Sequence, residues 1–265
     1  MPLKIALVDA FADGPFTGNP AGVVILDGPS LSDAQMQNIA LEMNQAETAF
    51  AYPLGDGTWS LRWFTPTVEV DLCGHATLAM AHRMWEEGTV KENRIAFSTR
   101  SGLLSAAQLS EGVQLDFPAE MPHAADPPSN IVETLGVAPL WWGRNRMDHF
   151  AVVRPEALEG DWNGRMGSIS ELGMRGLIVT SIGDYGRDFV SRCFFPQSGV
   201  PEDPVTGSAH CALAPYWSER LKKPDLIGYQ ASARGGTVGC TVMGDRVALR
   251  GGAVTTMVGE LTTFD

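Results

Sequence analysis

The 265-residue sequence has no excess of positive charge and no long apolar run. Its 19 lysines and arginines stand against 31 acidic residues, which gives a formal net charge of −12. A nucleic-acid-binding protein needs a basic surface to neutralise phosphates, and anionic membranes also attract basic segments. No stretch approaches the ~20 apolar residues that span a bilayer. We therefore expect no nucleic-acid partner and no membrane partner.

Cysteine is scarce, and its few occurrences are scattered. Cys73, Cys193, Cys211 and Cys240 show no CxxC spacing. The apolar run after Met1 is short and alternates like a strand, so it does not resemble the hydrophobic region of a signal peptide. These features predict a cytoplasmic protein with reduced thiols.

The familiar catalytic signatures are also missing. The chain has no phosphate-binding P-loop, no GxGxxG fingerprint, no GxSxG elbow and no HExxH zinc motif. His75 and His82 are the only histidines close to each other, and no carboxylate or thiol completes a metal-ligand pattern with them in the sequence. The sequence thus gives no support for a metal site.

What is present is a series of short segments divided by glycine and proline. Eight of them alternate in the manner of strands. They are 3–8, 21–26, 48–52, 59–64, 112–117, 176–180, 189–195 and 246–249. Helices are predicted over 33–43, 75–87 and 208–221. Ser32 and Gln35 form a capping-box pattern at the start of the first helix.

The second and third predicted helices are apolar on nearly all sides. A helix of this kind belongs in the interior of a protein. We therefore expect each of them to be surrounded by strands. Pro215 lies inside the third helix and is expected to kink it or to end its regular hydrogen bonding.

Two parts of the chain resemble each other. Segments 62–66 and 74–81 are similar to segments 192–196 and 207–214, at shifts of 192 − 62 = 130 and 207 − 74 = 133 residues. Two related halves, with three more residues in the second loop, explain both shifts. The alternative is a chance likeness between two strand-loop-helix units, which share turn chemistry.

The two loops that lead into the buried helices lie at corresponding places in these halves. Segments 71–75 and 202–208 each bring a glycine to a helix start, where unpaired N–H groups and the helix dipole attract an anion. Two such starts facing one cleft would bind a carboxylate or a developing enolate. The alternative is that the glycines only permit tight turns and that Asp203 and Ser208 only cap the helix.

Glu47 opens the strand predicted after the first helix and shares a face with the small residues Ala49 and Ala51. A glutamate in such a place is most often only solvated. A carboxylate among small, partly apolar neighbours has a raised pKa, however, and this suits a general base that must also return the proton.

Several ordered blocks of the sequence resemble the phenazine-biosynthesis isomerase (PhzF-like) family. They run from Asp9 to about residue 214, and the glycine-rich end fits more loosely. The blocks are 9–11 with 16–24, 44–50, 64–66, 71–77 and 202–209.

This resemblance implies the diaminopimelate-epimerase-like fold. That is an α+β architecture of two pseudo-symmetric lobes, each a mixed β-sheet rolled around a central α-helix, with the site in the cleft between them. The N-terminal lobe is expected over 1–115, completed by about 252–265, and the C-terminal lobe over 116–251.

The resemblance also implies roles for individual residues. Glu47 matches the catalytic acid/base of the family. The residues that match its substrate-binding positions are Gly74, His75, Asp203, Gly207 and Ser208. The expected activity is isomerisation of a small carboxylate without a cofactor or a metal, in a protein that forms a homodimer.

Two other functions stay open at this point. The first is a two-base amino-acid racemase or epimerase, because Cys73 lies where those related enzymes keep one thiol. Against it, Pro204-Val-Thr-Gly207 has no cysteine where they keep the second, and Cys211 lies a turn into the helix. The second is a non-catalytic binding protein on the same fold, since fold and motif do not guarantee chemistry.

Overall fold

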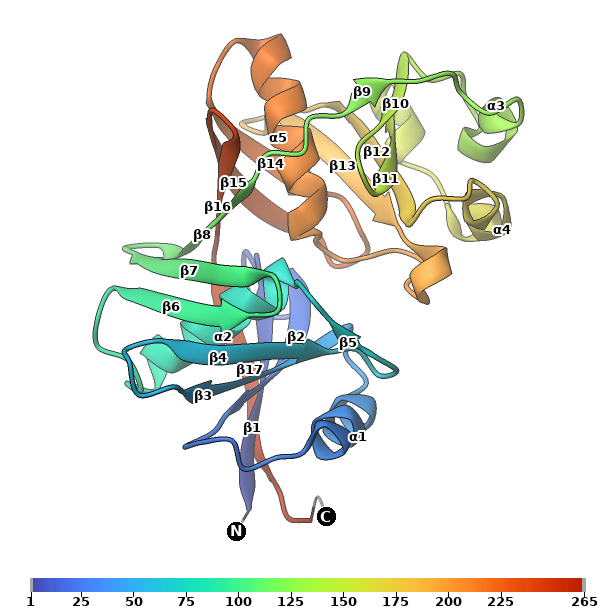
Figure 1. Cartoon of the computed structure of the whole chain (residues 1–265). Helices are drawn as coiled ribbons and strands as arrows, with labels where there is room; N and C mark the ends of the chain where they lie inside the picture. Colours follow the sequence, from blue (N-terminus) through green and yellow to red (C-terminus); the bar gives the residue numbers. More distant parts are fainter. Residues whose placement is uncertain (1, 264–265) are drawn as a thin grey trace. The chain divides into compact units, whose positions relative to one another are not determined.

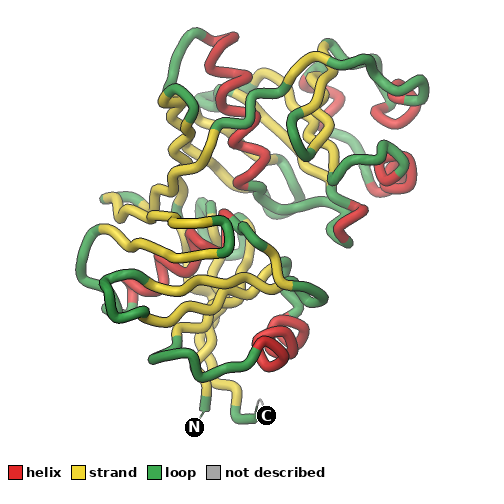
Figure 2. The backbone as a smooth tube through the Cα atoms, viewed as in Figure 1, coloured by secondary structure: helices red, strands yellow, loops and turns green. Residues whose placement is uncertain are grey.

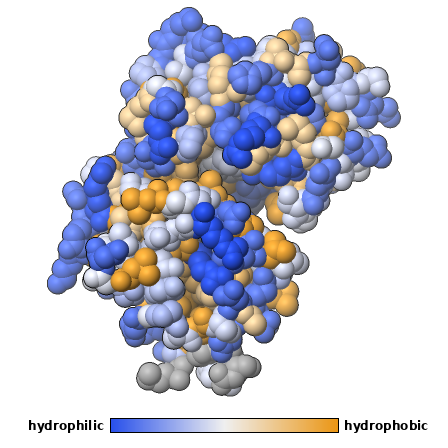
Figure 3. All heavy atoms as spheres, in the orientation of Figure 1, coloured by the Kyte–Doolittle hydropathy of each residue, from blue (hydrophilic) through white to orange (hydrophobic). Residues whose placement is uncertain are grey.

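The computed structural model describes residues 2–263, which form two compact units (Figure 1). The first unit takes the residues up to Asp116 together with those from Arg250 onward, and the second spans Phe117–Leu249. No helix in the described part of the chain is long and apolar enough to cross a membrane. On the face drawn in Figure 3, hydrophilic residues are abundant and apolar ones form small groups among them.

The first unit is a mixed sheet with two helices. In the sheet β17, β1 and β2 pair antiparallel, β2 with β3 parallel, β3 with β4 antiparallel, β4 with β6 parallel, and β6 with β7 antiparallel. The two-residue β5 pairs with β4. The elements are β1 (Leu3–Ala10), β2 (Asn19–Ile25), α1 (Asp33–Met43), β3 (Glu47–Pro53), β4 (Trp59–Phe64), β5 (Glu69–Val70), α2 (Gly74–Glu86), β6 (Arg94–Thr99), β7 (Gly102–Leu109) and β17 (Ala253–Leu261).

The second unit repeats this succession. β10 and β11 pair antiparallel, β11 and β12 parallel, β12 and β13 antiparallel, β13 and β14 parallel, and β14 and β15 antiparallel. The elements are β9 (His123–Ala124), α3 (Ile131–Leu135), β10 (Trp141–Arg144), β11 (Asp148–Val152), η1 (Pro155–Leu158), η2 (Asn163–Arg165), α4 (Met166–Ser170), β12 (Gly176–Ile182), β13 (Phe189–Phe194), η3 (Pro196–Ser198), α5 (Gly207–Leu221), β14 (Asp225–Gln230) and β15 (Gly236–Met243). In the sequence, β8 (Gly112–Pro118) and β16 (Arg246–Gly251) each pass from one unit into the other.

The same ion pair follows the corresponding strand in each unit. Arg62 on β4 binds the carboxylate of Glu69 with Nε and Nη2, both at 2.7 Å. Arg192 on β13 binds Glu202 in the same bidentate way, at 2.7 and 2.9 Å. A fork-to-fork pair of this kind fixes direction as well as distance, so it holds the loop that leads to the next helix. The shared succession and the shared pair support a duplicated origin of the two halves.

The long helix of each unit lies among strands (Figure 2). Eight residues of α2 and nine residues of α5 are buried, on all sides of each helix. The prediction of two buried helices is therefore confirmed, with starts at Gly74 and Gly207, one residue before the predicted ones. The capping box of Ser32 and Gln35 is confirmed at the start of α1, where each residue satisfies a backbone group of the other.

The helix α5 continues past Pro215 to Leu221, and its regular hydrogen bonding is interrupted at Pro215, as expected. Proline has no N–H to bond the carbonyl four residues before it, here that of Cys211. The backbone N–H of Glu120 takes its place and donates to this oxygen at 2.9 Å. A hydrogen bond from a neighbouring segment thus satisfies the group that Pro215 leaves free.

The buried imidazole of His210, within α5, makes the stability of the fold depend on pH. His210 is fully buried, and its Nδ1 lies 2.8 Å from the carbonyl oxygen of Thr206. Burial lowers the pKa of His210 to about 4. In the unfolded chain a histidine titrates near pH ~6.5, so between these values only the unfolded chain binds the proton. The free energy of unfolding must then fall as the pH is lowered through this window.

We therefore expect His210→Asn to weaken the pH dependence of stability. The histidine makes the native chain lose about 2 kcal/mol between about pH 7 and about pH 5, and the variant lacks this contribution. Urea unfolding at the two pH values measures the difference. An equal loss of stability in both proteins would show that His210 does not stay neutral in the folded state.

Candidate active site

Glu47, Cys73 and His75 lie together in the first unit. Glu47 is the first residue of β3, and Cys73 and His75 flank the start of α2. The Nε2 atom of His75 is 3.3 Å from Oε2 of Glu47, and its Nδ1 is 3.5 Å from the Cys73 thiol and 3.3 Å from Nδ2 of Asn19. The imidazole ring thus lies between a carboxylate on one side and a thiol with an amide on the other.

Burial determines the charge of His75. Its side chain is 7% exposed, whereas that of Glu47 is 20% exposed. Burial lowers the pKa of His75 to about 3, so the ring is neutral at neutral pH. The contact between the two side chains therefore joins a carboxyl group to a neutral imidazole. A carboxyl group thus lies beside a ring of constant charge.

The start of α2 adds hydrogen-bond donors to this group. Cys73 is the residue before the helix, and the first intrahelical bond at this end joins the N–H of Thr77 to the Cys73 carbonyl. The N–H groups before Thr77 have no acceptor within the helix, and they carry the positive end of its dipole. Gly74 and His75 are thus placed to hold negative charge near the Glu47 carboxyl group.

A second group lies at the start of α5. The carboxylate of Asp203, which is 9% exposed, accepts a hydrogen bond of 2.5 Å from the Thr206 hydroxyl. The buried side chain of Gln230 donates to the Asp203 carbonyl at 2.7 Å and accepts from the Thr206 N–H at 2.9 Å. These bonds fix the loop before Gly207. The residue that precedes the helix is Thr206, and its side chain bonds Asp203 rather than the helix backbone.

Arg175 and Asp148 complete this second group, and they were not predicted. Asp148 is fully buried and accepts from Nε and Nη2 of Arg175 at 2.8 and 2.6 Å. The same Nη2 lies 3.0 Å from the Ser208 hydroxyl oxygen. Burial acts to lower the pKa of Arg175, but the hydrogen bonds and the charge of Asp148 outweigh it and raise that pKa. The guanidinium therefore stays charged and holds the Ser208 hydroxyl.

The predicted residues thus form two groups, one in each unit. Glu47, Gly74 and His75 belong to the first, and Asp203, Gly207 and Ser208 surround the start of α5 in the second.

The spacing of residues in the sequence gives no support for a metal site, but the fold brings a carboxylate and a thiol to His75. Glu47, Cys73 and His75 each place one metal-ligating atom within 4.8 Å of the others. Glu47 comes from a strand far away in the sequence, so the spacing of residues along the chain does not show this cluster. It is the one such group of three found among residues 2–263.

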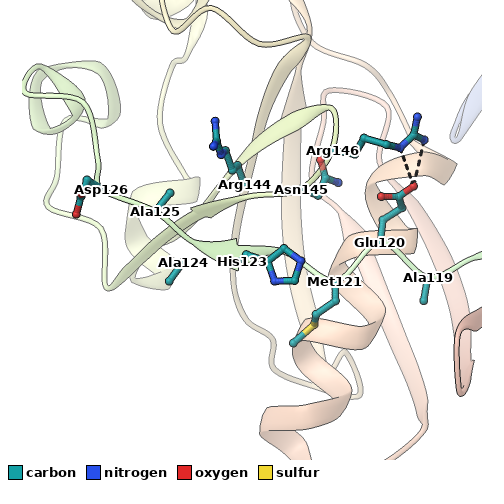
Figure 4. Close-up of a pocket in the computed structure, with 10 residues that line it drawn as sticks. All are labelled: Ala119, Glu120, Met121, His123, Ala124, Ala125, Asp126, Arg144, Asn145 and Arg146. Atoms are coloured by element: carbon teal, nitrogen blue, oxygen red, sulfur yellow. Dashed lines mark hydrogen bonds and ion pairs between the residues drawn. The ribbon is translucent and has the colours of Figure 1, made fainter.

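A separate hollow of about 810 Å³ lies in the second unit, along β9 and the end of β10 (Figure 4). Arg146 forms an ion pair with Glu120 at 3.1 Å on its wall, while Arg144 and His123 are exposed. Its other lining residues are Ala119, Met121, Ala124, Ala125, Asp126 and Asn145. None of the predicted site residues lines this hollow.

Known proteins match both the sequence and the fold. The family described as phenazine biosynthesis-like protein (PhzC-PhzF) matches residues 8–143 and 147–259. The chain belongs to this family. A relative from Halalkalibacterium halodurans, named as an isomerase, is 48% identical over 264 residues, which are 98% of this chain and 99% of that protein. The PhzF-like chain is accordingly an isomerase of this family.

Solved structures agree with the assignment. The crystal structure of a PhzF family protein from Enterococcus faecalis matches with a TM-score of 0.93 and 40% identity, over 99% of this chain and 100% of that one. A hydroxyproline epimerase from Agrobacterium vitis is 12% identical with a TM-score of 0.66, over 100% of this chain and 93% of that one, and shows likeness of fold alone. The predicted epimerase-like α+β fold is confirmed.

Proposed function

We propose that this PhzF-like isomerase moves a proton on a small carboxylate substrate, with Glu47 as its acid/base and without a cofactor. The observation that carries the proposal is the contact of Glu47 with His75, a buried ring kept neutral by its burial. Glu47 would take a proton from an activated C–H bond of the substrate. It would return the proton to another carbon of the double bonds that are conjugated with that position. The N–H groups at the start of α2 would stabilise the enolate-like charge formed in between.

The second half of the chain has no counterpart of this base. If Arg62 corresponds to Arg192, the strand pairings make Gly176 on β12 the equivalent of Glu47 on β3. A side chain at Gly176 has no room, because its Cβ would lie 2.1 Å from the Phe195 ring and 2.4 Å from the Phe194 carbonyl oxygen. Of these two equivalent positions, only the first therefore has a carboxylate. A proton shift by a single base requires no second one.

The racemase alternative requires a second thiol, and the loop before Gly207 contains no cysteine. Cys73 precedes Gly74 at the start of α2, and the residue in the same place before Gly207 is Thr206. A two-base inversion needs an acid on each face of the substrate, and neither Thr206 nor the rest of Pro204-Val-Thr-Gly207 supplies the second thiol. Deuterium exchange at the α-carbon of amino acids, abolished by alkylation of Cys73, would revive that alternative.

We propose that Asp203 and Ser208 bind polar groups of a small carboxylate. Asp203 is an acceptor, and Ser208 is oriented by Arg175 at 3.0 Å. The guanidinium and the start of α5 both favour a negatively charged group near Ser208. An acidic protein can in this way hold an acidic ligand.

We also propose a homodimer in the cytoplasm, and sedimentation of the purified protein would test the dimer.

The proposed function is tested with a set of small unsaturated carboxylates, among them the cyclohexadiene carboxylate expected for the family, trans-2,3-dihydro-3-hydroxyanthranilate. Loss or shift of the conjugated absorption during incubation measures isomerisation. We expect conversion of at least one compound, and no conversion of its carboxamide, because the charge that the helix starts and Arg175 attract is then absent. Equal conversion of acid and amide would contradict the proposed binding mode.

A further inference from the structure

The cluster of Glu47, Cys73 and His75 has the donor atoms of a zinc site. Thiolate sulfur, imidazole nitrogen and carboxylate oxygen are the ligands that zinc takes in proteins. One such atom from each residue lies within 4.8 Å of the other two. The proposed isomerisation needs no metal ion, and a cysteine in this place has no part in it.

The donors lie near one another but are not yet arranged around one centre. With zinc bonds of about 2.3 Å to sulfur and about 2.0–2.1 Å to nitrogen and oxygen, a tetrahedral ion separates its ligand atoms by roughly 3.3–3.6 Å. The thiol of Cys73 is 3.5 Å from Nδ1 of His75, and the Glu47 carboxylate is 3.3 Å from Nε2, the opposite nitrogen of the ring. One ion uses only one of these nitrogens, and with a single atom from each residue the three donors lie within 4.8 Å of one another, so binding requires the side chains to move together.

The charges of the cluster also suit a divalent cation. His75 is 5% exposed, and no hydrogen bond reaches its Nε2 within residues 2–263. A buried imidazole nitrogen in this position can offer its lone pair to a metal ion. A thiolate and a carboxylate together balance the two charges of the ion.

We propose that Cys73, His75 and Glu47 bind Zn²⁺, with water as the fourth ligand, and that the bound ion inhibits the isomerase. Inhibition follows because a carboxylate that coordinates zinc no longer accepts a proton from a substrate. The inhibition rests on the proposed function of Glu47, whereas the binding of the metal does not. Zinc would thus act as a reversible regulator of the same site.

The metal site is tested with Co²⁺ in place of Zn²⁺, on the purified chain and without substrate. A thiolate ligand gives Co²⁺ an intense charge-transfer absorption in the near ultraviolet, and Zn²⁺ should abolish it by displacement. We expect this absorption in the native protein and in Cys211→Ser, and its loss in Cys73→Ser. Cys211 is a matched control, because at 5% exposure it is as buried as Cys73 at 6%.

The other ligands give graded effects. Residues that only support a metal ligand change the affinity by about 10- to 100-fold when they are replaced, so loss of a direct ligand should cost at least as much. Glu47→Gln should therefore keep the thiolate absorption and weaken Co²⁺ binding by about tenfold or more. An unchanged affinity in this variant would remove Glu47 from the site.

Two results would overturn the proposal. One is a native protein without thiolate-to-cobalt absorption, and the other is an absorption that persists in Cys73→Ser. If Cys73→Ser does not fold, alkylation of the native protein decides, since Zn²⁺ should slow labelling of Cys73 and leave Cys211 unaffected. Equal labelling of Cys73 with and without Zn²⁺ would also reject the site. The outcome for the metal is independent of whether Glu47 proves to be the acid/base.

Discussion

Replacing Glu47 by glutamine should abolish most of the turnover and leave the fold intact. The amide has the shape of the carboxyl group but cannot accept the proton, and loss of a general acid/base lowers rates by about 10²–10⁴-fold. The Glu47 side chain is partly exposed and lies at the start of β3, so the change does not disturb the core. We expect kcat to fall by about 10³-fold, with little change in the unfolding midpoint.

Two further variants make this measurement specific. Glu47→Asp keeps a carboxyl group but withdraws it from His75, so it should retain more activity than the glutamine variant. Glu42→Gln removes an exposed carboxylate from α1 and should leave kcat unchanged. A Glu47→Gln protein that turns over substrate like the native enzyme would show that another group moves the proton.

Removal of the Asp148 carboxylate should have the second largest effect, on stability and on substrate binding together. Asp148→Ala leaves the Arg175 guanidinium without its bidentate partner, and breaking a buried ion pair costs about 3–5 kcal/mol. The lower end, about 3 kcal/mol, applies because the Arg175 side chain is 34% exposed and water screens part of the charge. The KM should also rise, because Arg175 no longer holds Ser208.

A double variant separates the positioning role of Arg175 from its structural role. Asp148→Ala with Arg175→Met removes the unpaired charge, so we expect most of the stability to return. Because Ser208 then still lacks its hydrogen-bond partner, the KM should remain high while kcat changes little. Unfolding titrations and steady-state kinetics on the three proteins measure this. If both the stability and the KM of the double variant returned to the native values, Arg175 would contribute to the stability of the fold alone.

Local signals in the sequence predicted much of the fold. The capping box marked the start of α1, and the apolar residues on all sides of two segments marked the buried helices α2 and α5. β11, whose five residues are all buried, is not among the predicted strands. The interrupted hydrogen bonding at Pro215 is predictable from the sequence, whereas the donor that satisfies the Cys211 carbonyl, the N–H of Glu120, is distant in the sequence and is not.

The candidate site shows the same limit more sharply. Glu47 and His75 stand in blocks of sequence that resemble the PhzF-like family, whereas Arg175 is 27 residues from Asp148 and 33 from Ser208. The parallel pairing of β11 with β12, which sets Asp148 beside Gly176, brings Asp148 and Arg175 together. One signal in the sequence could have indicated this ion pair. Asp148 and Arg175 each stand near the start of a mainly apolar segment that forms a strand. Parallel neighbours place such charges at the same edge of a sheet.

The most direct test of the single-base mechanism is NMR of a converted carboxylate incubated in D₂O with the native protein and with Glu47→Gln. The account predicts that the native enzyme isomerises the substrate and places deuterium from the Glu47 carboxyl group at the carbon that gains the proton. The glutamine variant should show neither change. Deuterium uptake that persists in Glu47→Gln, or that inverts an α-carbon without moving a double bond, would contradict the account.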